Sequence, residues 1–153
     1  MPAASLADVV VLDASPLGLV TNPKPSPAGD ACNRWLRALL DRGVRVILPE
    51  IVDYEVRREL LRAGKSASVA RLDALRVTLE YLPLTTEAMR QAAAFWAQAR
   101  NQGQPTASDK ALDGDVILAA QAVLLGAPRL IVATTNVGHL SRFVAADLWQ
   151  NIT

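Results

Sequence analysis

The sequence predicts an α/β fold with three layers, in which helices cover both faces of a central parallel sheet of four or five strands. Two observations support this prediction: short apolar runs typical of buried strands recur along the chain, and longer helical patterns separate them. Parallel strands need long crossover connections, so this alternation favours parallel pairing. A chain of 153 residues that is 51% hydrophobic suits one domain, which we expect to span residues 1–153.

The predicted strands are apolar at consecutive positions rather than alternate ones, which indicates burial on both faces of the sheet. They cover Val9–Leu12, Val44–Leu48, Tyr81–Leu84 and Leu130–Ala133, with a short edge strand at Leu148–Ile152. The predicted helices cover Asp30–Arg42 with Asp30 as the cap, Ile51–Ala63, Ser68–Glu80, Thr86–Asn101 and Lys110–Leu125. Glycine follows most of them closely, as is typical of helix ends.

The helix at 86–101 carries a regular apolar stripe. Met89, Ala92, Ala93, Trp96 and Ala99 recur at helical spacing, which predicts that they pack in the core. Trp35 and Trp149 are also expected in the core, with a dimer or partner surface as the alternative. Loops are expected at the proline-rich stretch Thr21–Pro27 and the polar stretch Asn101–Ser108.

The composition excludes several classes of protein. No apolar stretch is long enough to cross a bilayer, and the N-terminal residues lack the pattern of an export signal. Cys32 is the single cysteine and His139 the single histidine, so an internal disulfide and a zinc site of several His or Cys ligands are both excluded. We therefore expect a cytoplasmic protein with no membrane partner.

Basic residues gather in one part of the chain, although the net charge is only +1. The stretch from residue 34 to residue 76 holds ten basic residues against six acidic ones. Most of them are arginine, whose paired donors match phosphate. We expect Arg57, Arg58 or Arg62 to bind the backbone of a nucleic acid. The alternative is that this stretch contains only solvated helix faces.

Four acidic residues are predicted to meet at the carboxyl edge of the sheet, where ligands bind in folds of this kind. Asp13 directly follows the first strand, and Glu55 lies beside the apolar stripe of the helix after the second. Asp113 and Asp115 open a helix that is apolar nearly all round. Carboxylates gathered in one place repel one another unless a cation lies between them. Such clusters hold Mg²⁺ or Mn²⁺ for phosphodiester chemistry.

Each of these acids also has a structural interpretation. Asp13 could cap the helix that follows it, and Glu55 could belong to a surface ion pair. Asp113 and Asp115 point about 200° apart on a helix, so they cannot occupy the same position in a site, and periodicity does not choose between them. Ser15 is close enough in sequence to hydrogen-bond a metal-bound water, or could itself be the cap.

A further candidate follows the fourth strand. Asn136 can offer a neutral oxygen to a metal, or hydrogen bonds to a phosphate or to the acids. The candidate segments, in chain order, are Val11-Leu12-Asp13-Ala14-Ser15, Pro49 through Glu55-Val56, Asp115-Val116-Ile117-Leu118-Ala119-Ala120 and Thr134-Thr135-Asn136. Together they resemble the motifs of the PIN-domain nucleases, a family that includes the VapC-type toxins of bacterial toxin–antitoxin pairs.

The resemblance implies a metal-dependent endoribonuclease that cleaves single-stranded RNA, with Mg²⁺ or Mn²⁺ as the cofactor. It implies that Asp13, Glu55 and Asp115 are catalytic acids and metal ligands, with Asp113 as a helper. Asn136 takes the fourth position, where the most acidic form of the pattern has aspartate, so the metal count stays at one or two. The resemblance further implies an antitoxin protein as a partner, and a homodimer is the expected assembly.

Two other functions fit parts of the sequence. A phosphatase or phosphotransferase of the haloacid dehalogenase type also begins with a strand ending in Asp, and Lys110 and Thr134 loosely match its later motifs. That chemistry needs a second Asp two residues after the first, where this chain has Ser15. A PIN-like scaffold that binds a protein partner without catalysis is the third interpretation, and it predicts no tight Mn²⁺ binding.

Overall fold

A five-stranded parallel sheet forms the centre of the computed structural model, which describes residues 6–102 and 109–153. The strands are β1 (Val9–Leu12), β2 (Arg45–Pro49), β3 (Glu80–Leu82), β4 (Leu130–Ala133) and β5 (Ala146–Asp147). They lie in the order β3-β2-β1-β4-β5, and every neighbouring pair is parallel. The predicted parallel sheet is confirmed. Most of the polar loop expected at 101–108 lies outside the described residues.

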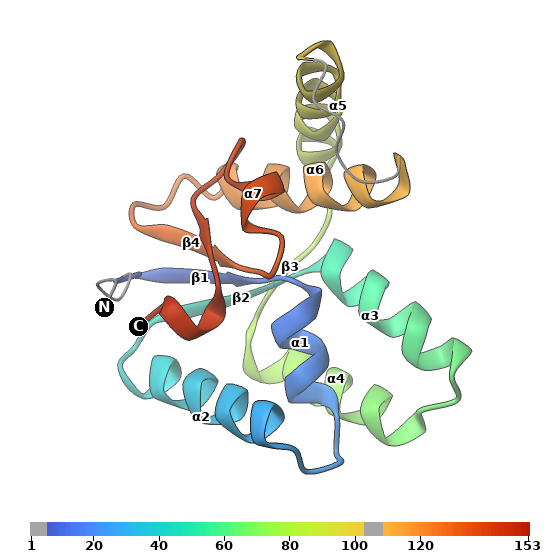
Figure 1. The fold of residues 1–153 in the computed structure, drawn as a ribbon, viewed down its shortest axis with the longest axis vertical. Coiled ribbons are helices and arrows are strands. Elements are labelled where there is room, and N and C mark those ends of the chain that lie inside the picture. Colours follow the sequence, from blue (N-terminus) through green and yellow to red (C-terminus); the bar gives the residue numbers. More distant parts are fainter. Residues whose placement is uncertain (1–5, 103–108) are drawn as a thin grey trace.

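Helices cover both faces of this sheet (Figure 1). On one side lie α1 (Ala14–Thr21), α2 (Pro27–Asp41), α3 (Glu50–Arg62) and α4 (Ser66–Thr78), and on the other lie α6 (Asp109–Val123) and α7 (Val137–Leu140). Helix α5 (Thr86–Asn101) packs on α6, and a short 3₁₀ helix, η1 (Trp149–Asn151), follows β5. The predicted three-layer architecture is confirmed. None of the helices in the described ranges has the length and apolar character that a bilayer crossing requires.

Strand β1 is the centre of the sheet, and all four of its residues are buried. Its Val11 lies opposite Ile47 of β2 and Val132 of β4, so three apolar strands share one register. Because these strands run parallel, their carboxyl ends reach the same edge of the sheet. The segments that follow β1, β2 and β4 therefore start from one place, although they are far apart in sequence.

The first two helices begin at capping residues. Asp13 accepts the N–H of Ala14 at 2.7 Å and so caps α1. Ser26 accepts the N–H of Gly29 at 3.0 Å and caps α2. The predicted cap at Asp30 was therefore wrong: Asp30 lies in the first turn of α2, where negative charge is favourable.

The C-terminal edge strand forms earlier in the chain than the sequence predicted. Strand β5 pairs with β4 at residues 146–147, and residues 149–151 form a 3₁₀ helix instead of the expected strand. The carboxylate of Asp147 accepts both the N–H of Leu148 at 2.8 Å and the side-chain amide of Asn151 at 3.1 Å. These local hydrogen bonds fold the chain back and end the strand.

Helix α5 contacts the rest of the molecule along a narrow stripe. Ala92 and Ala99 are buried against α6, as predicted, but Ala93 is exposed, Met89 is 45% exposed and Trp96 is 37% exposed, against the prediction. The expectation that both large side chains lie in the core was wrong. The reason is visible in Figure 1, where α5 stands away from the sheet and has α6 as its main neighbour. Of the predicted stripe, the small side chains of Ala92 and Ala99 are the ones buried in the close helix–helix contact.

Candidate active site

Asp13 lies at the carboxyl end of β1, and its side chain is held by the first residue of α1 and by the residue that follows β4. Its side chain is buried, and its two oxygens accept the N–H of Ala14 and the hydroxyl of Thr134, each at 2.7 Å. The same Thr134 hydroxyl accepts the main-chain N–H of Asn136 at 2.8 Å. The residue after β4 thus orients the carboxylate after β1. The cap that sequence offered as an alternative role for Asp13 is real, and it leaves the carboxylate at the sheet edge.

Glu55 reaches this edge because Gly114 makes room for it. A Cβ atom at Gly114 would lie 2.5 Å from Glu55 Oε1 and 3.3 Å from its Cδ. The carboxylate of α3 therefore occupies the space that a side chain on α6 would fill. Gln121 secures this helix pair, because its amide accepts the N–H of Ile51 at 3.3 Å and donates to Leu82 O at 2.9 Å.

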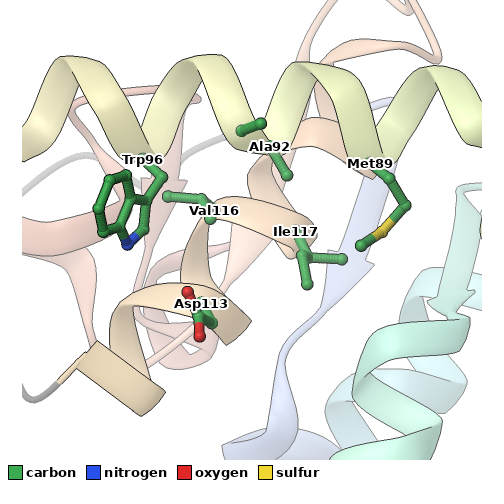
Figure 2. A pocket seen from close by; sticks show the side chains of 7 residues that line it. Met89, Ala92, Trp96, Asp113, Val116 and Ile117 are labelled. Atoms are coloured by element: carbon green, nitrogen blue, oxygen red, sulfur yellow. The ribbon is translucent and has the colours of Figure 1, made fainter.

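Asp115 and Asp113 lie on different faces of α6. Asp115 is buried and faces the other two acids, and its Oδ2 is 3.6 Å from His139 Nδ1. Asp113 is exposed and lines a groove of about 420 Å³ between α5 and α6, together with Met89 and Trp96 (Figure 2). The structure thus distinguishes the two aspartates, as their angular separation on the helix required.

Electrostatics couple the three inward acids. Burial raises the pKa of Asp13, although its hydrogen bonds from Thr134 and Ala14 oppose the shift. Burial also raises the pKa of Glu55, and the nearby charges of Asp13 and Asp115 raise it further, while Arg58 lowers it. Burial and the charge of Asp13 raise the pKa of Asp115 to about 6. Each carboxylate is thus held where its negative charge is unfavourable.

Two predicted contributors lie near the candidate segments: Ser15 follows Asp13 by two residues, and Asn136 follows Thr134 by two. The Ser15 hydroxyl is buried and has no hydrogen-bond partner among the described residues, as expected of a group kept for a water or a ligand. Asn136 is exposed, and its main-chain N–H is used while its side chain caps no helix. Both side chains are therefore free to take part in a site at this edge.

The three arginines predicted to bind a nucleic-acid backbone have different partners in the structure. Arg57 lies between Asp53 at 3.0 Å and Asp73 at 2.8 Å, where it ties α3 to α4. Arg62 pairs with Glu59 on the exposed surface at 2.9 Å. The guanidinium of Arg58 lies 5.1 Å from the ring centre of the exposed Tyr54, close enough to Glu55 to lower its pKa. Of the three, Arg58 is next to the acids.

Sequence reasoning missed four members of this site. The Thr134 hydroxyl holds Asp13, Gly114 admits Glu55, and His139 and Arg142 lie near Asp115. Thr134 belongs to a candidate segment and Gly114 lies between the two candidate aspartates, so their positions were the available signal, although sequence reasoning gave neither this role. Nothing in the sequence indicated that His139 and Arg142 lie near Asp115, because the segment after β4 reaches α6 only in the folded protein.

The carboxylates of Asp13, Glu55 and Asp115 and the side-chain amide of Asn136 suit a hard divalent cation, which prefers carboxylate and amide oxygens as ligands. Among residues 6–102 and 109–153, no three His, Cys, Asp or Glu side chains are arranged to hold a metal ion as they stand. Three like charges repel one another, and a cation is what would draw them together. The acids are buried and repel one another, and the Ser15 hydroxyl beside Asp13 lacks a hydrogen-bond partner among the described residues. These features together favour a binding site for a cation and for the groups that the cation binds.

The chain matches one family model and is similar in fold to several solved structures. The family model described as PIN domain matches residues 10–141. Among solved structures, VapBC2 from Rickettsia felis, bound to a DNA fragment from its promoter, has a TM-score of 0.72 at 16% identity, covering 92% of this chain and 98% of that one. VapBC-1 from nontypeable Haemophilus influenzae has a TM-score of 0.66 at 15% identity, covering 93% and 98%.

A toxin from Mycobacterium tuberculosis shares the fold as well. Its VapC20, described as cleaving the sarcin–ricin loop, has a TM-score of 0.62 at 18% identity, covering 88% of this chain and 96% of that one. At such identities the likeness is one of fold. A comparison with curated protein sequences finds no match.

Proposed function

We propose that this chain, which belongs to the PIN-domain family of nucleases, is a divalent-metal-dependent endoribonuclease that cleaves single-stranded RNA. The observation that carries the proposal is the meeting of Asp13, Glu55 and Asp115 at the carboxyl edge of the sheet, where each has a raised pKa. Perturbed acids gathered in this way are typical of catalytic sites. The resemblance in motifs and the family match agree with this geometry.

Asp13, Glu55 and Asp115 would hold the ion, with Asn136 as a neutral ligand. A divalent cation such as Mg²⁺ or Mn²⁺, when bound, activates water and stabilises negative charge on the phosphate. Thr134 keeps the Asp13 carboxylate in one orientation by its hydrogen bond, and the free Ser15 hydroxyl can bind a water beside it. Asp113, on the other face of α6, receives less support as a ligand.

RNA would approach along α3, the helix that carries Glu55. Arg58 has the best position to bind its backbone, because it is next to Glu55 and is paired with a ring rather than an acid. Arg62 is exposed and only weakly held by Glu59, so it can exchange that partner for a phosphate. Arg57 would have to leave two acids, which makes it the least suitable of the three.

The test is cleavage of single-stranded RNA by purified protein with Mn²⁺ and with EDTA. Asp13→Asn and Asp115→Asn should each lower cleavage roughly a thousandfold or more, because the ion loses a charged ligand. Asp113→Asn should retain most activity. Asp8→Asn is the matched control, since Asp8 lies at the opposite edge of the sheet. Full activity in EDTA, or in Asp115→Asn, would contradict the proposal.

The rival functions predict different results in the same assay. A phosphatase of the haloacid dehalogenase type would hydrolyse small phosphate esters and leave RNA intact. A scaffold without catalysis would bind no Mn²⁺ tightly, so calorimetric titration with Mn²⁺ alone identifies it. The Ser15 hydroxyl already weighs against the phosphatase, because it stands where that chemistry needs an acid.

A toxin role is the finer part of the proposal. Its support is that the similar solved structures include VapBC assemblies, and that one similar protein is described as a toxin. We accordingly propose an antitoxin protein as a partner and the cytoplasm as the location. Induced expression of the wild-type chain in a bacterium should arrest growth, whereas Asp115→Asn should not.

A homodimer is the assembly we propose. The support is the groove between α5 and α6, whose exposed Met89 and Trp96 lie two turns apart on a helix that stands away from the sheet (Figures 1 and 2). Light scattering should give twice the mass of one chain, and Trp96→Asp should reduce it to a monomer. A monomeric wild-type protein would contradict this assembly without affecting the proposed chemistry.

A further inference from the structure

Arg142 places a guanidinium group beside the acids without pairing it to any of them. Its Nε donates to the carbonyl of His139 at 3.1 Å, and both of its terminal nitrogens are buried without a hydrogen-bond partner among the described residues. The group lies close enough to Asp115 for its charge to lower the pKa of that carboxyl. A buried cation with unused donors is unfavourable unless an anion reaches it.

The guanidinium is held in place by the elements around it. Its Cζ lies 5.1 Å from the ring centre of Phe143, and that ring stacks on Phe95 of α5 at 4.7 Å with an angle of 28°. The hydrogen bond from Nε to the His139 carbonyl, made within the plane of the group, holds it further. Donors oriented before a ligand arrives lose little entropy on binding, which is the arrangement that favours charge stabilisation in catalysis.

Three other arginines of the described chain have clear acidic partners. Arg45 and Arg129 each bind an acid through two nitrogens on the exposed surface. One terminal nitrogen of Arg57 also lacks an aligned hydrogen bond, but it lies 2.8 Å from an oxygen of Asp73. Arg142 differs from these three, because it lies near a cluster of acids and yet donates both terminal nitrogens to none.

We propose that Arg142 binds the phosphate group at which the RNA chain is cut, by donating from its two terminal nitrogens to the non-bridging oxygens. The two parallel donors of a guanidinium match a phosphate, and the proximity of Asp115 places that phosphate next to the acids. The guanidinium keeps its proton throughout, so it stabilises charge and transfers nothing. This inference rests on the proposed ribonuclease function and assigns it a substrate-binding cation.

The alternative is that Arg142 only orients Asp115. The two roles differ in what happens to metal binding when the guanidinium is removed. A residue that orients a metal ligand should weaken Mn²⁺ binding when it is replaced. A residue that binds phosphate should leave Mn²⁺ binding unchanged or tighter, because a nearby positive charge has gone.

The experiment compares the wild type with Arg142→Met, Arg142→Lys and the control Arg45→Met. Arg45 pairs with Glu80 at the opposite edge of the sheet, so its replacement removes one arginine without touching the site. Three quantities are measured: cleavage of a short single-stranded RNA in Mn²⁺, calorimetric binding of Mn²⁺ alone, and fluorescence anisotropy of the same labelled RNA in EDTA. Thermal unfolding checks that each variant is folded.

We expect Arg142→Met to remain folded, to bind Mn²⁺ as well as the wild type, and to cleave RNA about 100-fold more slowly. Arg142→Lys should recover part of this loss, because it restores the charge but not the paired donors. RNA binding in EDTA should weaken in Arg142→Met and not in Arg45→Met.

Two results would overturn the inference while the ribonuclease function stands. The first is cleavage by Arg142→Met within about threefold of the wild type. The second is parallel loss of Mn²⁺ binding and cleavage, which would make Arg142 a positioning residue. If the wild type itself cuts no RNA, the proposed function fails, and the anisotropy arm still decides: equal RNA binding by Arg142→Met and the wild type, or none by either, overturns the phosphate role.

Discussion

The two edges of the sheet both carry acidic residues, which are exposed and paired with arginine at the amino edge and largely buried near one another at the carboxyl edge. At the amino edge, Asp8 pairs with Arg129 at 2.7 Å, and Arg45 donates to Glu80 at 2.9 Å, all of them exposed. At the carboxyl edge, Asp13 and Asp115 are buried and face Glu55 without any such pairing. Asp8 and Glu80 each have their own arginine, whereas Asp13, Glu55 and Asp115 lie near one another, with His139 Nδ1 3.6 Å from Asp115.

This difference separates the charges that are paired on the surface from the charges that the proposed site would use. Arg45 lowers the pKa of Glu80, so that carboxylate is more stable charged in the folded protein than in water. Burial raises the pKa of all three acids at the other edge, and the charges of neighbouring acids raise it further for Glu55 and Asp115, so folding works against their charge. Unfavourable charges kept at one place are a mark of ligand binding, whereas paired surface charges are common on any protein.

The largest expected effect is on the pH dependence of stability. Asp115 has a pKa of about 6 in the folded protein against an ordinary value of 3.8, so the folded state binds its proton more tightly than the unfolded state does. The stabilisation is therefore present below pH 4 and is lost as the pH rises through 6, by up to about 3 kcal/mol. Urea unfolding from pH 4 to pH 8 in EDTA measures it.

Asp115→Asn should abolish most of this loss, whereas Asp113→Asn, on the exposed face of the same helix, should leave the profile as it is. Mn²⁺ affinity should rise over the same pH window, because the ligands must lose their protons to bind the ion. A wild-type protein that gains stability between pH 4 and pH 8 in EDTA would show that the carboxyl edge carries no unfavourable charge.

A smaller effect is expected from Gly114→Ala. Alanine is favoured over glycine inside a helix, so α6 should gain about 1 kcal/mol. The new Cβ would displace the flexible end of Glu55, which lies 2.5 Å from its position, and cleavage should fall about 10- to 100-fold. Gly18→Ala in α1 is the matched control, because nothing lies within 4 Å of its Cβ. It should gain stability and keep full activity.

The outcome for Gly114→Ala is informative because stability and activity should move in opposite directions. Unfolding by urea and RNA cleavage are measured on the same preparations. Activity equal to that of Gly18→Ala would show that the position of the Glu55 carboxylate does not matter for cleavage.

The smallest effect is expected from Asp8→Asn at the amino edge. Exposed ion pairs contribute little, so the free energy of unfolding should fall by less than about 1 kcal/mol, and added salt should shrink the difference. RNA cleavage and Mn²⁺ binding should not change. A loss of cleavage in this variant would remove the contrast between the two edges.

Much of the fold followed from the sequence because its signals are local. Strands β1 and β4 have the predicted ends, since each is a continuous apolar run bounded by polar residues. Helix α5 also has its predicted ends, with Thr85 accepting the N–H of Ala88 as a cap. By contrast, α7 and η1 are so short that periodicity cannot reveal them.

The sequence identified the acidic residues of the site, but it did not show which side chains face one another or what they bind. Asp13, Glu55 and Asp115 stand out in sequence because carboxylates adjoin apolar segments, and the structure places them together at one edge. The choice of Asp115 over Asp113 needed the tertiary placement of α6, which turns Asp115 toward Asp13 and His139 and leaves Asp113 lining the groove beside α5. Their roles as metal ligands stay predictions.

The sequence by itself determined the alternation of the strands with the longer helices, the sheet edge at which a site would form, and the family motifs. These depend on hydrophobic periodicity and on residues near one another in the chain. Only the tertiary structure decided that Gly114 admits Glu55, that Thr134 holds Asp13, and that the terminal nitrogens of Arg142 lie near Asp115 with no hydrogen-bond partner among the described residues. Such contacts join residues from different elements, and their distances exist only after the helices have packed on the sheet.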